Sequence, residues 1–76
     1  MTVEKVFGIV DDGYGWKRTV LKTDGSYTPY VVCTGYNADT QSWASAYGYY
    51  HNKQELAECI LKFIADGGYF EGELVF

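Results

Sequence analysis

Residues 52–68 read NKQELAECILKFIADGG and contain the clearest structural signal in the chain. Asn52 is a residue type favoured at helix N-caps, and Glu55 follows three positions later, where the acid of a capping box belongs. One apolar stripe recurs at helical spacing and consists of Leu56, Ile60, Phe63 and Ile64, widened by Ala57, Cys59 and Leu61. Residues 66–68 end the pattern, because glycine readily adopts the left-handed conformation after a helix. The segment predicts an amphipathic helix over residues 53–65.

Strand-like segments lie on both sides of this helix, four before it and one after it. They are residues 3–10, 16–22, 27–34 and 43–50, and a final strand from Tyr69 onward. Asp24-Gly25 between the second and third segments is a strong hairpin signal. Pro29 cannot donate a ladder hydrogen bond, which predicts an edge strand or a bulge near the start of the third. The order β-β-β-β-α-β predicts an α+β fold, a small antiparallel sheet with one helix packed on one face.

Side-chain alternation divides the last two strands into faces. In the fourth strand, Trp43, Tyr47 and Tyr49 fall on one side, and Ala44, Ala46 and Gly48 fall on the other. In the last strand, Phe70, Leu74 and Phe76 share one face, and Tyr69, Glu71 and Glu73 share the other. Gly72 predicts a bulge or a close approach of another strand. The position of this strand within the sheet is left open.

The length of the chain sets the number of domains. The 76 residues suit a single domain, residues 1–76. A domain of this size buries only about 60% of the surface that its unfolded chain exposes. Eight tyrosines and two tryptophans must share that small interior with four phenylalanines. We therefore expect several Tyr and Trp rings to remain at the surface.

The formal net charge of −4 restricts the classes of partner. It disfavours binding to nucleic-acid backbones and to anionic lipid, both of which attract Lys and Arg. Most of the negative charge lies in residues 24–76, where seven acids stand against two bases. Within the helix, Glu58 and Lys62 have the spacing of a favourable ion pair. Net acidity serves solubility alone, or it marks a surface for a basic protein partner.

The compartment is inferred from the absence of targeting signals in the sequence. No segment has the length and hydropathy of a membrane span, and the first residues do not resemble a signal peptide. We therefore expect a cytoplasmic protein without membrane partners. Cys33 and Cys59 are then expected to be buried thiols rather than a disulfide.

Residues that could carry chemistry are few. Residues 11–15 (DDGYG) could ligate a hard cation, but they lack EF-hand spacing, and a hairpin turn with solvated acids is the favoured interpretation. His51 is the only histidine, and its spacing does not pair it with Cys33 or Cys59 as base and nucleophile. These three residues do not form a zinc pattern either. The sequence predicts no catalytic residue, no metal site and no cofactor.

The aromatic residues are the strongest functional signal. Exposed Tyr and Trp side chains bury much area at small entropic cost and commonly anchor binding. Alternatively, tyrosines simply cover the outer face of a thin sheet with their hydroxyls in water. The residues expected at a binding surface are aromatic or acidic, and are Tyr14, Trp16, Tyr36, Asp39, Trp43, Tyr47, Tyr49, Glu71 and Glu73. The acids would steer this surface to a basic partner.

These features favour a non-catalytic, acidic protein-binding module. In composition alone, the chain resembles small acidic, tyrosine-rich proteins of phages and mobile elements, some of which block host defence nucleases. That resemblance implies inhibition of a host nucleic-acid-binding or defence enzyme as one role. Three alternatives stay open. The chain could be an enzyme only if a concave pocket gathers His51 with Asp or Glu side chains. Aromatic side chains with Lys17, Arg18 and Lys22 could bind single-stranded nucleic acid, and an exposed strand edge or aromatic patch could drive self-association.

Overall fold

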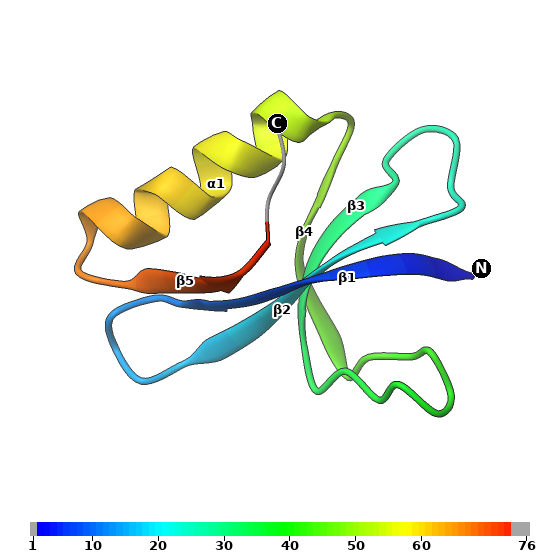
Figure 1. Ribbon diagram of the computed structural model, residues 1–76, viewed down its shortest axis with the longest axis horizontal. Coiled ribbons are helices and arrows are strands. Elements are labelled where there is room, and N and C mark those ends of the chain that lie inside the picture. Colours follow the sequence, from blue (N-terminus) through cyan, green and yellow to red (C-terminus); the bar gives the residue numbers. More distant parts are fainter. Residues whose placement is uncertain (1, 74–76) are drawn as a thin grey trace.

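A twisted five-stranded antiparallel sheet with one helix forms the protein in the computed structural model, which describes residues 2–73 (Figure 1). The elements are β1 (Val3–Asp11), β2 (Lys17–Thr23), β3 (Tyr30–Thr34), β4 (Ser45–Tyr50), α1 (Lys53–Ala65) and β5 (Tyr69–Gly72). The strands lie in the order β4-β3-β2-β1-β5, and α1 packs on one face of the sheet. The predicted α+β fold and order of elements are confirmed.

The N-terminal end of α1 is set by its cap. The side chain of Asn52 accepts a hydrogen bond from the backbone N–H of Glu55 at 2.9 Å, as predicted. The Glu55 carboxylate does not return to the backbone of Asn52. Its Oε1 instead accepts from the backbone N–H of His51 and lies 3.1 Å from His51 Nδ1. The reciprocal half of the capping box is therefore shifted by one residue.

The glycines after α1 stop the helix and turn the chain into β5. Gly67 has a φ of +100°, and its N–H donates to the carbonyl of Ile64 at 3.0 Å. The N–H of Gly68 donates to the carbonyl of Phe63 at 2.9 Å. This Schellman motif satisfies carbonyls at the end of the helix. It directs β5 back along β1, its antiparallel neighbour, the position that the sequence left open.

β1 and β5 approach each other closely at a pair of glycines. Gly8 faces Gly72, with φ values of +154° and +146°. A Cβ atom at Gly8 would collide with the carbonyl oxygen of Glu71, and one at Gly72 with that of Phe7. The close approach predicted at Gly72 is confirmed. Leu74 and Phe76, expected on the apolar face of this strand, lie outside the described residues.

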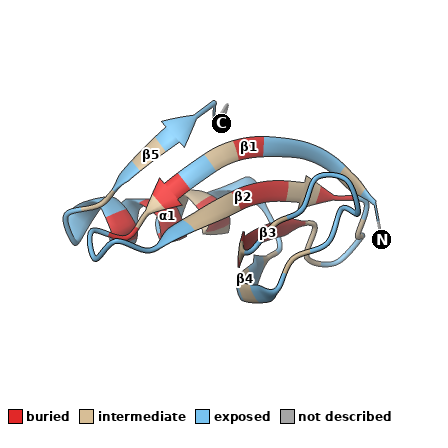
Figure 2. Cartoon of the chain, turned by 90° about the horizontal axis from the view of Figure 1, so that it is seen from below, coloured by how far each residue is buried: buried red, intermediate tan, exposed pale blue. Residues whose placement is uncertain are grey.

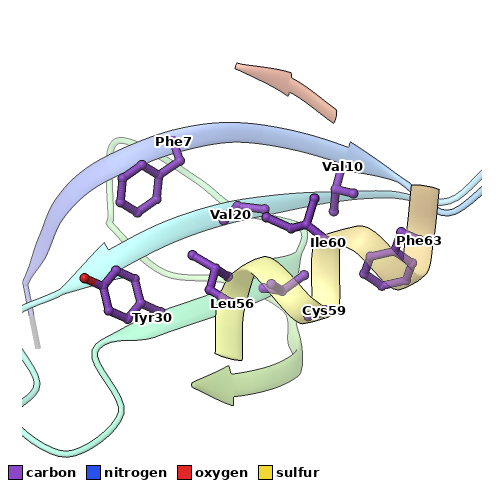
Figure 3. Packing of buried hydrophobic residues seen from close by; sticks show 9 residues of the cluster. Phe7, Val10, Val20, Tyr30, Leu56, Cys59, Ile60 and Phe63 are labelled. Carbon is purple, nitrogen blue, oxygen red and sulfur yellow. The ribbon is translucent and has the colours of Figure 1, made fainter. Parts of the chain in front are cut away.

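The main core lies between α1 and the sheet (Figure 3). Its buried side chains are Phe7, Val10, Val20, Tyr30, Val32, Leu56, Cys59, Ile60 and Phe63. In Figure 3, Phe7 and Tyr30 lie at one end of this cluster and Phe63 at the other. The apolar stripe of α1 is narrower than predicted, since Leu61 is 62% and Ile64 43% exposed. A single helix buries only the side chains that point directly at the sheet.

The opposite face of the sheet holds a second, smaller cluster. Leu21, Val31 and Cys33 are fully buried there. Tyr36 and Trp43, from the loop between β3 and β4, pack against them. Trp43 lies before β4, whereas the sequence predicts that it is part of this strand. This loop therefore takes the place of a second layer, while β5 and the N-terminal half of β1 remain largely exposed (Figure 2).

Pro29 precedes β3 rather than lying within it. Its carbonyl oxygen accepts hydrogen bonds from the backbone N–H of Thr23 at 2.7 Å and from Thr23 Oγ1 at 3.2 Å. These bonds close the hairpin between β2 and β3 that Asp24-Gly25 predicted. β3 lies between β2 and β4, and its register against β2 has no shift, so both predicted alternatives, an edge position and a bulge near its start, are wrong. Because the strand begins after the proline, it keeps its ladder N–H groups.

A bulge in β4 overturns the predicted faces of that strand. The register against β3 shifts between Ala46 and Gly48, so Tyr47 is the extra residue. Tyr47 turns to the helix side, where its ring centroid lies 5.0 Å from that of Phe63. Tyr49 lies on the opposite face of the sheet, across from β3 residues of the smaller cluster. The prediction that Tyr47 and Tyr49 share one side is wrong, because alternation fails across a bulge.

Candidate functional site

Two shallow grooves border the side chain of Tyr47. The first, which we call the aromatic groove, has a volume of about 270 Å³ and is lined by Trp16, Arg18, Thr34, Ser45, Ala46 and Tyr47. The second, the helix groove, has a volume of about 240 Å³ and is lined by Tyr47, Tyr50, Glu55, Glu58, Cys59 and Lys62. The bulge in β4 creates this arrangement because it turns Tyr47 toward α1.

The aromatic groove has two exposed rings and a pair of hydroxyls. Trp16 is 64% exposed and Tyr47 is 52% exposed. The hydroxyl oxygens of Thr34 and Ser45 lie 2.6 Å apart at the ends of β3 and β4 that meet beside the groove. The groove therefore offers large apolar surfaces next to groups that can donate or accept a hydrogen bond.

An ion pair holds Arg18 against the aromatic rings. Arg18 Nη1 lies 3.0 Å from Asp12 Oδ2. The guanidinium carbon is 4.8 Å from the centre of the Tyr47 ring and 5.4 Å from that of Phe63. Both contacts have the geometry of cation–π interactions. Arg18 thus connects the loop after β1, the bulge in β4 and the end of α1, and it packs against the Tyr47 ring.

Asp12 organises the loop that presents Trp16. Its Oδ1 accepts hydrogen bonds from the backbone N–H groups of Tyr14 at 2.8 Å and Trp16 at 3.3 Å. Burial acts to raise the pKa of Asp12, but the bonds from Tyr14, Arg18 and Trp16 outweigh it, and the pKa lies below its ordinary value. The predicted hairpin turn is present, but this acid is not solvated, since its side chain is only 12% exposed.

The helix groove contains neutral and charged groups side by side. The Tyr50 hydroxyl donates to Cys59 Sγ at 3.0 Å. Burial raises the pKa of Tyr50 and that of Cys59, so both stay protonated at neutral pH. Glu58 and Lys62 also line the groove, but the ion pair predicted between them is not among those formed within residues 2–73.

His51 lines neither groove. Its imidazole contacts Glu55, as described, and its ring meets the ring of Tyr27 edge-on, with centroids 4.5 Å apart. The two thiols are free, and Cys33 and Cys59 belong to clusters on opposite faces of the sheet. Within residues 2–73, no three His, Cys, Asp or Glu side chains are grouped so as to hold a metal ion.

Three of the predicted site residues lie near one another. Trp16 and Tyr47 share the aromatic groove, and Tyr14, which is 78% exposed, belongs to the loop that presents Trp16. Asp39 is exposed in the loop that joins Thr34 to Ser45. One end of the sheet therefore collects much of the predicted aromatic surface.

The other predicted residues lie elsewhere. Tyr36 and Trp43 are partly buried over the smaller cluster, and Tyr49, 50% exposed, lies on that same face. Glu71 lies on β5, at the opposite edge of the sheet from β4, and Glu73 directly follows that strand. The structure thus does not gather the acids and the aromatic rings into a single patch.

Sequence reasoning missed the roles of Asp12 and Arg18. The sequence predicts Asp12 in a solvated turn, and it predicts Arg18 and Lys22 as possible phosphate contacts. Arg18 and Lys22 are instead both paired with acids. Arg18 pairs with Asp12, and Lys22 Nζ lies 2.6 Å from Glu4 Oε1. The available signal was alternation along β2, which places Arg18 on the same face as the buried Val20.

Three comparisons address the relation of this chain to known proteins. No family model, no curated protein and no solved structure matched it. Within residues 2–73, no helix combines the length and apolar character needed to cross a membrane. Function is therefore inferred from the geometry of the two grooves.

Proposed function

We propose that this chain is a non-catalytic protein-binding module whose contact is centred on the aromatic groove. The main support is that Trp16 and Tyr47 are 64% and 52% exposed although Asp12 bonds the backbone of Trp16 and Arg18 contacts the ring of Tyr47. Rings that are ordered before binding lose little conformational entropy on association. Tyr14 extends this surface along the neighbouring loop.

A basic protein surface is the partner that the charge of the chain favours. The net charge of −4 attracts such a surface over a distance and accelerates association. Cytoplasmic enzymes that bind nucleic acids have surfaces of this kind. Inhibition of a host nucleic-acid-binding or defence enzyme is the role that we propose within this class.

Binding of single-stranded nucleic acid is a second candidate. Trp16, Arg18 and Tyr47 line one groove, an arrangement in which bases could stack beside a cation. Against this candidate, Arg18 and Lys22 are engaged by Asp12 and Glu4, so phosphate contacts would compete with existing ion pairs.

Affinity capture from the native host tests the proposal. We expect the wild-type chain to retain a basic protein, and Trp16→Ala and Tyr47→Ala to weaken its binding about 10-fold or more. Tyr27→Ala is the matched control, since Tyr27 is 75% exposed and lines neither groove. Circular dichroism confirms that each variant is folded. Equal capture by all variants contradicts the proposal, and tight binding of labelled single strands in fluorescence anisotropy supports the second candidate instead.

A further inference from the structure

The helix groove combines aromatic walls with an excess of negative charge. Tyr47 and Tyr50 line it together with two carboxylates and one ammonium group. One carboxylate, Glu55, is engaged by His51 at 3.1 Å. The other, Glu58, forms no ion pair within the described part of the chain. A cationic group would therefore find an available carboxylate beside exposed ring surface.

The protein itself shows how a guanidinium binds at Tyr47. Arg18, the only arginine of the chain, lies 4.8 Å from the centre of the Tyr47 ring and 3.0 Å from the Asp12 carboxylate. A ring and a carboxylate together hold a guanidinium, because the ring attracts its planar face and the carboxylate accepts hydrogen bonds from its N–H groups. The helix groove repeats these two elements with its tyrosines and Glu58, and Arg18 does not line it.

We propose that the helix groove receives an arginine side chain of the basic protein partner. This inference rests on the proposed protein-binding function and specifies the chemistry that the partner presents. Arginine fits better than lysine, because a planar guanidinium can stack on a tyrosine ring while its edge donates to a carboxylate. Tyr47 borders both grooves, so a single partner engages this ring together with Trp16.

Small probes test the groove without knowledge of the partner. N-acetyl-arginine amide is titrated into the isotope-labelled chain, with N-acetyl-citrulline amide as its uncharged analogue. We expect the arginine probe to shift the amide signals of Tyr47, Tyr50 and Glu58, with a dissociation constant of about 1–10 mM. The citrulline probe leaves these signals in place, because it has lost the charge that Glu58 and the rings attract.

Two variants of the same helix are expected to act in opposite directions. Glu58→Gln weakens binding of the arginine probe about 2- to 5-fold, whereas Lys62→Gln strengthens it by a similar factor, because a like charge is removed. Glu71→Gln, on the far edge strand, leaves the affinity unchanged. The amide spectra of the free variants show that each retains the native fold.

Three results would overturn the inference. They are equal shifts with the citrulline probe, shifts centred on β5 or on Tyr49, and changes of the same sign in Glu58→Gln and Lys62→Gln. If capture of a partner still depends on Trp16 in any of these cases, the protein-binding function stands and only the arginine site is rejected. If the probe binds as expected but capture is insensitive to Trp16 and Tyr47, the proposed function fails instead.

Discussion

Asp12 is the single residue on which most of the aromatic groove depends. One carboxylate oxygen orders the loop through Tyr14 and Trp16, and the other holds Arg18. Since Arg18 contacts the rings of Tyr47 and Phe63, the loss of this carboxylate affects both walls of the groove. An acid in a short turn thus positions both the loop of Trp16 and the arginine beside Tyr47.

Replacement of Asp12 by Asn is expected to reduce both the free energy of unfolding and the dependence of this free energy on pH in the acid range. The pKa of Asp12 in the folded protein lies below its ordinary value of 3.8. The charged carboxylate therefore stabilises the fold above pH 3.8, and this contribution is lost as the pH falls through the lowered pKa. Urea unfolding at several pH values between about 7 and about 2 measures the slope.

The decrease of the free energy of unfolding with falling pH is smaller in Asp12→Asn than in the wild type, but it does not vanish. Hydrogen bonds from Thr2 and His51 also lower the pKa values of Asp24 and Glu55, and these groups still titrate. An unchanged slope in Asp12→Asn would mean that its ion pair contributes nothing to the fold.

Gly8 makes the position of β5 possible, and its replacement by Ala is expected to be costly. The new Cβ would require a strained φ and would also collide with the backbone of Glu71. Gly15→Ala has a comparable strain at φ +95°, but its Cβ would meet open space. We expect losses of about 1 kcal/mol for Gly15→Ala and about 2 kcal/mol or more for Gly8→Ala in urea unfolding. Equal losses would contradict the role assigned to the close approach.

At the scale of elements, α1 shows what local sequence can and cannot predict. Its ends were predicted correctly because Asn52 and Gly67 act on their own neighbouring backbone groups. The width of its buried face was not, because burial of Leu61 and Ile64 depends on how much of the sheet lies opposite the helix. Helical periodicity alone contains no information about that extent.

Two leucines of α1 give a direct measure of this difference. Leu56 is fully buried and Leu61 is 62% exposed, although the sequence places both on the apolar side. We expect Leu56→Ala to lower the free energy of unfolding by about 2–5 kcal/mol and Leu61→Ala to change it by less than about 0.5 kcal/mol. Urea denaturation of both variants tests the pair. A large loss in Leu61→Ala would indicate that another surface covers this residue in solution.

The strands show the same division between local and distant causes. Turn residues predicted the first two connections well, because Gly, Asp and Pro act within a few positions. The bulge at Tyr47 and the pairing of β5 with β1 depend on contacts between distant segments. The aromatic groove follows from that bulge. The sequence could therefore predict exposed aromatic rings such as Trp16 and Tyr47, but it could not predict that Arg18 contacts the rings of Tyr47 and Phe63.

At the scale of the whole molecule, the two edges of the sheet differ in how they are protected against pairing with a strand of another copy. β5 is short and contains Glu71, whereas β4 contains no charged residue and is interrupted only by its bulge. Bulges and charges discourage strand pairing between copies. The net charge of −4 adds repulsion between identical chains.

We expect a monomer in solution for these reasons. Sedimentation velocity at about 0.02 M and about 0.15 M salt tests this, since screening weakens the repulsion at the higher value. A dimer at micromolar concentration would favour the self-association alternative. Its loss in a variant with a charge on the edge, Tyr49→Lys, would then assign the contact to β4.

The placement of the two thiols on opposite sides of the sheet has a practical consequence. Cys33 is covered by the loop that contains Tyr36 and Trp43, and burial raises its pKa to about 11, whereas Cys59 belongs to α1 and is buried on the side of the helix that faces the sheet. A thiol reagent therefore reaches Cys33 when this loop lifts, and it reaches Cys59 when α1 moves away from the sheet. Only Cys59 can react in the Cys33→Ser chain, and only Cys33 can react in the Cys59→Ser chain. The two reaction rates thus report separately on the movement of α1 and on that of the loop. Equal rates would indicate that this small protein opens in one concerted event.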